Sequence, residues 1–135
     1  MSLITDLLAR PANLPLLSKY SVINGYIYLA LGGLLTVWPG AVQALLFDPP
    51  FVGNESALFR VLGMTVAVIG WLYVFGGRGG GRNFGPASVL DRIVLVPLVL
   101  VPLVAAGIFP HTFGAFAVLD PALGIGAWLL HRRET

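Results

Sequence analysis

Four long apolar segments constrain this chain more than any other feature. They cover residues 20–38, 57–76, 89–109 and 113–130, and each is close to the roughly 20 residues that a helix needs to cross a membrane. In addition, 57% of the residues are hydrophobic and only 10% are charged, which is far from the balance of a soluble domain. We therefore expect an all-α integral membrane protein in which residues 1–135 form a single bundle of four transmembrane helices.

The segments that flank the first two spans predict elements at the membrane surface. Residues 1–19 carry apolar residues at helical spacing before two prolines, so we expect a short N-terminal interfacial helix there. The stretch 41–47 is apolar but too short to cross, and we expect it to lie along the interface after Pro39 has ended the first span. The glycine-rich stretch 76–86 should end the second span.

The basic residues indicate how the bundle is oriented. Lys and Arg precede the first span, occupy the second connection and follow the fourth span, whereas the first and third connections carry neither. By the positive-inside rule, both termini should be cytoplasmic. The net charge of +2 then reflects topology and lipid contact, and we expect no nucleic-acid partner. The arginines expected at lipid headgroups are Arg78, Arg82, Arg92, Arg132 and Arg133.

Two charged residues lie inside the predicted spans on the outer side of the membrane. Arg60 is about one helical turn into the second span, and Asp120 is somewhat deeper in the fourth. Because the long arginine side chain can reach down, we expect a buried ion pair that fixes the register of the two helices and keeps both charges away from lipid.

The proline after Asp120 adds an alternative to this interpretation. Pro121 cannot donate a hydrogen bond to the carbonyl of Ala117, so we expect the fourth helix to break there, either as a structural kink or as two half-helices. Discontinuous helices hold substrates and ions in transporters. Asp120 is therefore either architectural or functional, and the sequence leaves both open.

The third span begins with a pattern that is typical of a helix cap. Ser88 is followed three residues later by Asp91, which predicts a capping box with the carboxylate at the positive end of the helix dipole. Pro97 and Pro102 should bend the same span further along.

Several kinds of chemistry have no support in the sequence. The chain has no cysteine, and its two histidines, His111 and His131, fall on opposite sides of the membrane in the expected topology. We predict no catalytic residues, no metal site and no enzymatic activity. No cofactor is predicted either, and contact with a lipid, a quinone or a pigment is left open.

Three features resemble the BphX-like family of small bacterial four-helix membrane proteins. They are "FRVLGMTVAVIGWLY" in the second span, "LDRIVLVPLVL" in the third and an aspartate in the fourth, and the resemblance covers most of the chain after about residue 20. It implies a four-helix membrane fold in a bacterial inner membrane, and it offers no established activity. The residues to which it gives weight are Arg60, Gly63, Tyr73, Arg92 and Asp120.

Two functions follow from these observations. Short loops and the absence of a catalytic constellation favour a non-enzymatic accessory subunit, which stabilises the assembly of a larger membrane complex, such as an electron-transfer or photosynthetic one, by helix packing and lipid contact. Its partners would be other integral membrane subunits or further copies of itself. The alternative is a small transporter or ligand-binding bundle that uses Asp120 at a proline-broken helix.

Overall fold

Helices account for almost all of residues 3–9, 13–79 and 84–134, which the computed structural model describes. The prediction of four helices long and apolar enough to cross a membrane is confirmed: they cover Leu16–Val37, Glu55–Gly79, Phe84–Ala105 and Pro110–Glu134. No strand occurs in the described ranges. The elements are α1 (Leu3–Leu8), α2 (Leu16–Val37), α3 (Pro39–Leu45), α4 (Glu55–Gly79), α5 (Phe84–Leu90), a π-helical turn η1 (Asp91–Leu95), α6 (Val96–Ala105) and α7 (Pro110–Glu134).

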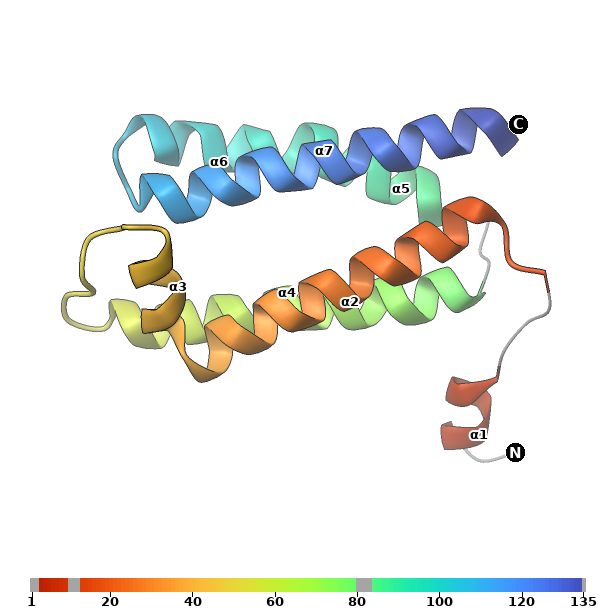
Figure 1. Cartoon of the computed structure of the whole chain (residues 1–135), viewed down its shortest axis with the longest axis horizontal. Coiled ribbons are helices and arrows are strands. Elements are labelled where there is room, and N and C mark those ends of the chain that lie inside the picture. The colour runs from red at the N-terminus through yellow and green to blue at the C-terminus, as the bar shows by residue number, and fades with distance from the viewer. Residues whose placement is uncertain (1–2, 10–12, 80–83, 135) are drawn as a thin grey trace.

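The four long helices form two layers, each an antiparallel pair (Figure 1). Helices α2 and α4 make one layer, and α7 packs against α5, η1 and α6 in the other. The short helix α3 lies at the end of the bundle that also holds the turn between α6 and α7. Helix α1 lies beyond the opposite end, where the C-terminus of α7 is also found. The short helices α1 and α3 fall where the sequence predicts interfacial segments.

Glycines at seven-residue spacing bring α2 and α4 into backbone contact. A methyl group added to Gly25 would lie 2.6 Å from the backbone nitrogen of Val74, and one added to Gly70 would lie 2.6 Å from that of Leu29. Gly32 likewise faces the backbone of α4, because a methyl group there would overlap the nitrogen of Ala67. Small residues allow this close approach, which replaces the hydrophobic driving force that is missing between helices in lipid.

The two layers are held together at both ends of the bundle. At one end, Leu17 of α2, Val89 of α5 and Ala127 of α7 form a buried apolar cluster. At the other end, the ring of Phe59 in α4 lies 4.7 Å from that of Phe109 before α7, and Phe51 and Phe113 join this aromatic group. Cavities lie along the seam between these two ends, and they contain the candidate sites.

The third span begins and ends earlier than predicted. Helix α6 stops at Ala105 because Gly107, with a φ of 74°, closes a Schellman motif. In this motif the N–H of Ile108 donates to the carbonyl of Leu103, and the N–H of Gly107 donates to the carbonyl of Val104.

The middle of the third span contains a wider helical turn. There the N–H of Val96 donates to the carbonyl of Asp91, five residues back. This wider π turn accommodates the missing N–H and the bulky ring of Pro97.

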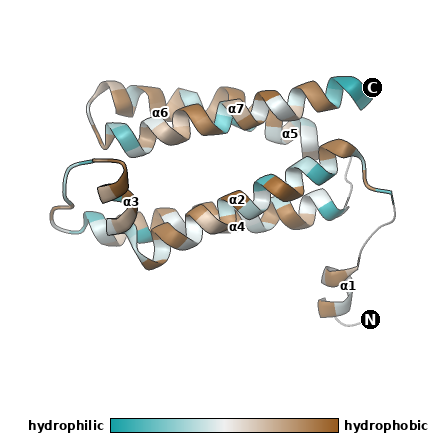
Figure 2. Cartoon of the chain, viewed as in Figure 1, coloured by the Kyte–Doolittle hydropathy of each residue, from teal (hydrophilic) through white to brown (hydrophobic). Residues whose placement is uncertain are grey.

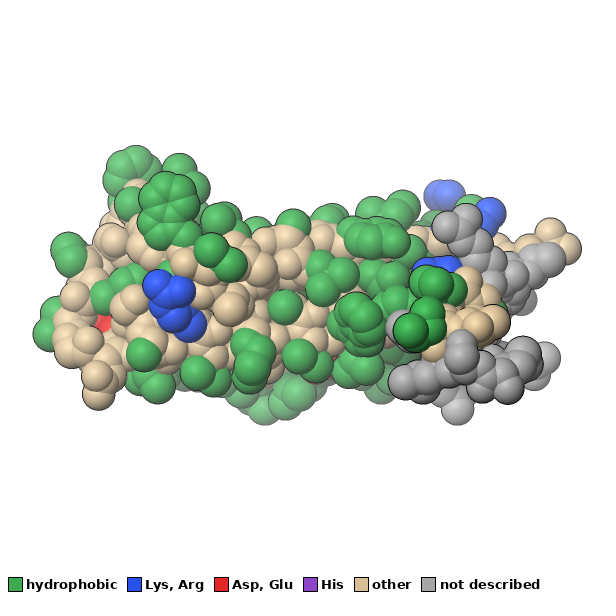
Figure 3. All heavy atoms as spheres, turned by 90° about the horizontal axis from the view of Figure 1, so that it is seen from below, with side chains coloured by type: hydrophobic (Ala, Val, Ile, Leu, Met, Phe, Trp, Pro, Cys, Tyr) green, Lys and Arg blue, Asp and Glu red, His purple; other side chains and the backbone are tan. Residues whose placement is uncertain are grey.

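The second span is also longer than predicted, because α4 continues through the first glycines of the connection to Gly79, and α5 already begins at Phe84. Hydrophobic residues occur along the length of all the long helices, and the C-terminal end of α7 is hydrophilic (Figure 2). On the face shown in Figure 3, the Lys and Arg side chains gather toward the two ends, while apolar side chains extend between them. This distribution is typical of a bundle with lipid around its middle.

Candidate functional site

The predicted ion pair between Arg60 and Asp120 is wrong. Nη1 of Arg60 instead donates to the backbone oxygens of Thr36, at 2.8 Å, and Val37, at 3.0 Å. These are carbonyls that the end of α2 leaves without helical partners, so the guanidinium complements the negative end of that helix. Because α4 packs against α2, this end of α2 is the nearer partner for Arg60.

Asp120 lies in an otherwise apolar cavity between α4, α6 and α7. The cavity has a volume of about 250 Å³. Within the described residues the carboxylate has neither a hydrogen bond nor an ion pair. An unpaired carboxylate in such surroundings is costly and needs a partner. The other lining residues are Leu62, Val66, Leu95, Val96, Val99, Leu100, Phe113 and Phe116.

Pro121 does not break α7. The helix is continuous over Pro110–Glu134 with this proline inside it. A proline in an apolar helix removes one backbone hydrogen bond, and packing on neighbouring helices is sufficient to keep the remaining ladder intact. The half-helix arrangement that the sequence suggested is therefore not formed, and Asp120 does not lie at a helix terminus.

Arg92 does not lie at a lipid headgroup, contrary to the prediction. Its side chain is only 1% exposed, and Nε donates to the hydroxyl of Tyr73 at 3.1 Å. The guanidinium carbon lies 4.3 Å from the centre of the Tyr73 ring and 5.4 Å from that of Tyr28. Because the third span begins at Phe84, Arg92 lies more than two turns inside it and points into the bundle.

Several buried polar atoms of Arg92 and of α2 have no hydrogen-bond partner among the described residues. Nη1 and Nη2 of Arg92 are buried without a partner, and so are Nδ2 of Asn24 and the hydroxyl of Tyr28, one turn apart on α2. Gly124 of α7 makes room for Arg92, because a methyl group there would lie 2.9 Å from its Cβ. A buried guanidinium without a carboxylate partner is an unusual feature and indicates a functional centre.

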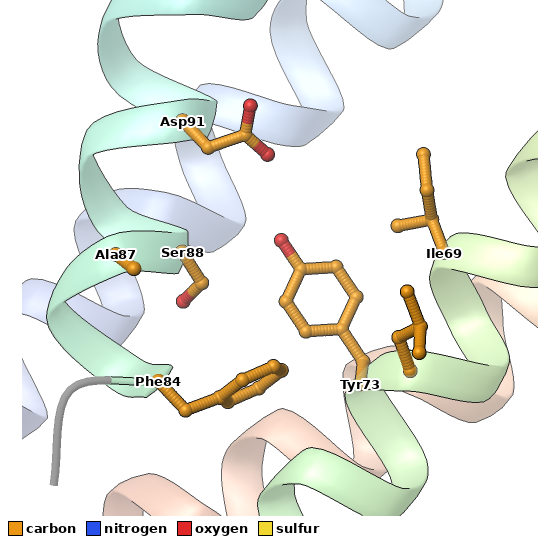
Figure 4. Close-up of a pocket in the computed structure, with 7 residues that line it drawn as sticks. Ile69, Tyr73, Phe84, Ala87, Ser88 and Asp91 are labelled. Carbon is orange, nitrogen blue, oxygen red and sulfur yellow. The ribbon is translucent and has the colours of Figure 1, made fainter. Parts of the chain in front are cut away.

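A second cavity, also of about 250 Å³, adjoins this centre on the seam between α4 and the third span. Figure 4 shows Tyr73 of α4 and Asp91 of η1 directed toward each other across it, with Phe84 and Ser88 nearby. The carboxylate of Asp91 has no hydrogen bond or ion pair to any described residue. The remaining lining residues are Ile69, Leu72 and Ala87.

The predicted capping box of Ser88 and Asp91 is wrong as well. The helix begins at Phe84, so Ser88 lies in its interior, and its hydroxyl donates to the carbonyl of Gly85 at 2.8 Å. A signal for the inward face was present in the spacing of Gly85, Ser88 and Arg92, which places all three on one side of a helix.

The structure describes most of the arginines that the sequence predicts at headgroups. Arg78 donates to the backbone oxygen of Leu8 at 3.2 Å, Arg132 lies over the ring of Trp128, and Arg133 is exposed. Arg78 lies in the last turn of α4, and Arg132 and Arg133 lie in the last turn of α7. These two turns are at the same end of the bundle (Figure 1), and the headgroup contact of the three arginines remains a prediction. Arg82 lies outside the described residues.

One site was missed by sequence reasoning. Asp48, in the loop after α3, is 4% exposed and accepts hydrogen bonds from the backbone N–H groups of His111 and Thr112 at the start of α7. Burial raises its pKa, but the hydrogen bonds from Thr112 and His111 outweigh this effect, so the pKa lies below its ordinary value. Since 63 residues separate Asp48 from His111, no local pattern reveals this contact.

No protein-family model, curated protein or solved structure matches this chain. The resemblance to the BphX-like family therefore stays a prediction. Within the part of the chain that is described, no group of three His, Asp or Glu side chains could hold a metal ion.

Proposed function

We propose that this protein is a non-enzymatic binding protein of a bacterial inner membrane, which holds a hydrophobic amine in the cavity between α4, α6 and α7. The observation that carries the proposal is the position of Asp120, an unpaired carboxylate in an apolar cavity of about 250 Å³. A cavity of this kind, with a single polar group among apolar walls, has the form of a small-molecule site.

The chemistry of the cavity limits what it can hold. Asp120 is the only charged residue among its lining residues, and the others are aliphatic or phenylalanine. A carboxylate in a low-dielectric site favours a group of opposite charge that also donates hydrogen bonds. An ammonium group on a compact hydrocarbon satisfies both conditions, whereas an anion would be repelled and a pure hydrocarbon would leave the carboxylate unpaired.

The test is the saturable binding of 1-adamantylamine and of adamantane to the protein in lipid nanodiscs, with empty nanodiscs as the background. These two molecules share one hydrocarbon cage and differ in the amino group. The wild type should bind the amine more tightly than the hydrocarbon. Asp120→Asn should weaken amine binding at least tenfold and leave adamantane binding unchanged. Val66→Phe, which fills this cavity, should abolish the part of amine binding that depends on Asp120.

A matched control is Asp91→Asn, which removes a carboxylate from the neighbouring cavity and should leave amine binding at the wild-type value. Equal binding of the amine by the wild type and Asp120→Asn would overturn the proposal. If the wild type binds neither molecule and instead purifies from its native membrane with stoichiometric partner subunits, the accessory-subunit function predicted from the sequence takes its place.

A further inference from the structure

We infer that the cavity between α4 and α5–η1 is a second ligand site, and that it takes an apolar molecule bearing a hydroxyl group. This inference does not depend on Asp120. It rests on the hydrogen-bonding groups that Tyr73 and Asp91 present to the cavity and on the position of Arg92 behind Tyr73.

Arg92 determines how the hydroxyl of Tyr73 can bond. Nε of Arg92 donates to this oxygen at 3.1 Å, so the hydroxyl acts there as an acceptor. Its own proton has no acceptor among the described residues. A hydroxyl that accepts a bond from a cation becomes a stronger donor, because hydrogen bonds in a chain polarise one another. Tyr73 therefore presents a free and strengthened O–H donor at the cavity wall.

Asp91 supplies the complementary acceptor. Its carboxylate lies across the cavity from the Tyr73 hydroxyl (Figure 4), and the structure gives it no partner over residues 3–9, 13–79 and 84–134. Ser88, the other polar residue of the cavity, already donates to the carbonyl of Gly85. The cavity thus offers one donor and one acceptor.

A hydroxyl group is the ligand group that satisfies both. Its oxygen accepts from Tyr73 while its proton is donated to Asp91. A carbonyl could accept from Tyr73 but would face the lone pairs of Asp91, and an ammonium could pair with Asp91 but would leave the Tyr73 proton unused. The remaining walls, which are Ile69, Leu72, Phe84 and Ala87, are suited to an apolar body.

This cavity is separate from the one that contains Asp120. The π turn η1 contributes Asp91 to the first and Leu95 to the second, and the two have no lining residue in common. One turn of widened helix therefore stands between a site suited to a hydroxyl and a site suited to an amine. π turns of this kind occur frequently at functional sites.

The experiment compares saturable binding of 1-adamantanol and adamantane in lipid nanodiscs. The wild type should prefer the alcohol. Asp91→Asn leaves the Arg92–Tyr73 bond intact and should weaken alcohol binding at least fivefold without changing adamantane binding. Tyr73→Phe should weaken alcohol binding at least tenfold. The control Tyr26→Phe alters a tyrosine that is 58% exposed and should have no effect.

Two further variants keep the result decisive. Ala87→Leu fills the cavity and should remove the preference for the alcohol even if Tyr73→Phe does not fold. Asp120→Asn should leave alcohol binding unchanged, which distinguishes this site from the proposed amine site. Equal affinity of the wild type for the alcohol and the hydrocarbon would overturn the inference, and so would a preference that Asp91→Asn and Ala87→Leu both retain.

Discussion

Oδ2 of Asp48 accepts a hydrogen bond of 2.6 Å from the backbone N–H of Thr112, and the loop after α3 thereby caps the start of α7. Oδ1 accepts a second bond, of 2.9 Å, from the N–H of His111. The first N–H groups of a helix have no partner within it, and a carboxylate also complements the positive end of its dipole. Asp48 therefore joins the two layers at the end of the bundle where α3 lies.

Replacing Asp48 by alanine should destabilise the protein. The substitution leaves the buried N–H of Thr112 and the partly buried N–H of His111 without their acceptor. We therefore expect the free energy of unfolding to fall by about 0.5–2 kcal/mol, the range for the loss of a helix cap. Thermal or chemical unfolding in detergent measures this change. Val52→Ala, in the same connection but at a position that is 73% exposed, is the matched control and should stay within about 0.5 kcal/mol of the wild type. An equal effect of both variants would contradict the role assigned to Asp48.

The same carboxylate should make stability depend on pH under acidic conditions. The pKa of Asp48 is lower in the folded protein than in the unfolded chain, so the unfolded chain binds its proton more readily. The stabilisation is then complete at pH values well above about 4, the ordinary pKa of aspartate, and is lost as the pH falls through and below it. Melting temperatures between pH 3 and 7 test this. Asp48→Asn should show a smaller decrease than the wild type, and parallel curves would exclude the effect.

The glycines between α2 and α4 allow a prediction with an internal control one residue away. Gly32→Ala places a methyl group against the backbone of Ala67, whereas Gly33 has no atom within 4 Å of such a methyl group. We expect Gly32→Ala to lower stability by about 1–3 kcal/mol through overpacking. Gly33→Ala should leave stability unchanged or raise it by up to about 1 kcal/mol through helix propensity. Unfolding in detergent measures both, and a stabilising Gly32→Ala would contradict the close approach.

The sequence predicts the four helices well because length and apolar character alone decide them. It does not predict which faces meet. The expected pair of Arg60 and Asp120 rested on similar depth, but depth does not say toward which neighbour a side chain points. Arg92 was misplaced for a related reason: the expected start of its helix lay five residues too late, which moved an interior residue to the membrane edge. The cap by Asp48 joins positions distant in sequence, which no local pattern can report.

Arg92 is expected to reduce stability rather than to supply it. Two of its nitrogens are buried without partners among the described residues, and the desolvation of such groups costs about 1–3 kcal/mol each. Its contact with two tyrosine rings offsets part of this cost. Arg92→Met, of similar length, should therefore raise the free energy of unfolding by about 1 kcal/mol or more, while weakening the binding of 1-adamantanol. A marked loss of stability in Arg92→Met would show that Arg92 is architectural.

The absence of cysteine from the sequence allows a direct test of orientation. Asn54, in the connection between α3 and α4, and Arg133, near the end of α7, are both exposed, and they lie at opposite ends of the bundle. If both termini are cytoplasmic, as the distribution of basic residues predicts, a membrane-impermeant maleimide should label Asn54→Cys in intact bacterial cells. The same reagent should label Arg133→Cys only after the cells have been permeabilised. The reverse pattern would invert the topology, and labelling of both variants in intact cells would contradict a membrane-spanning arrangement of α4 and α7.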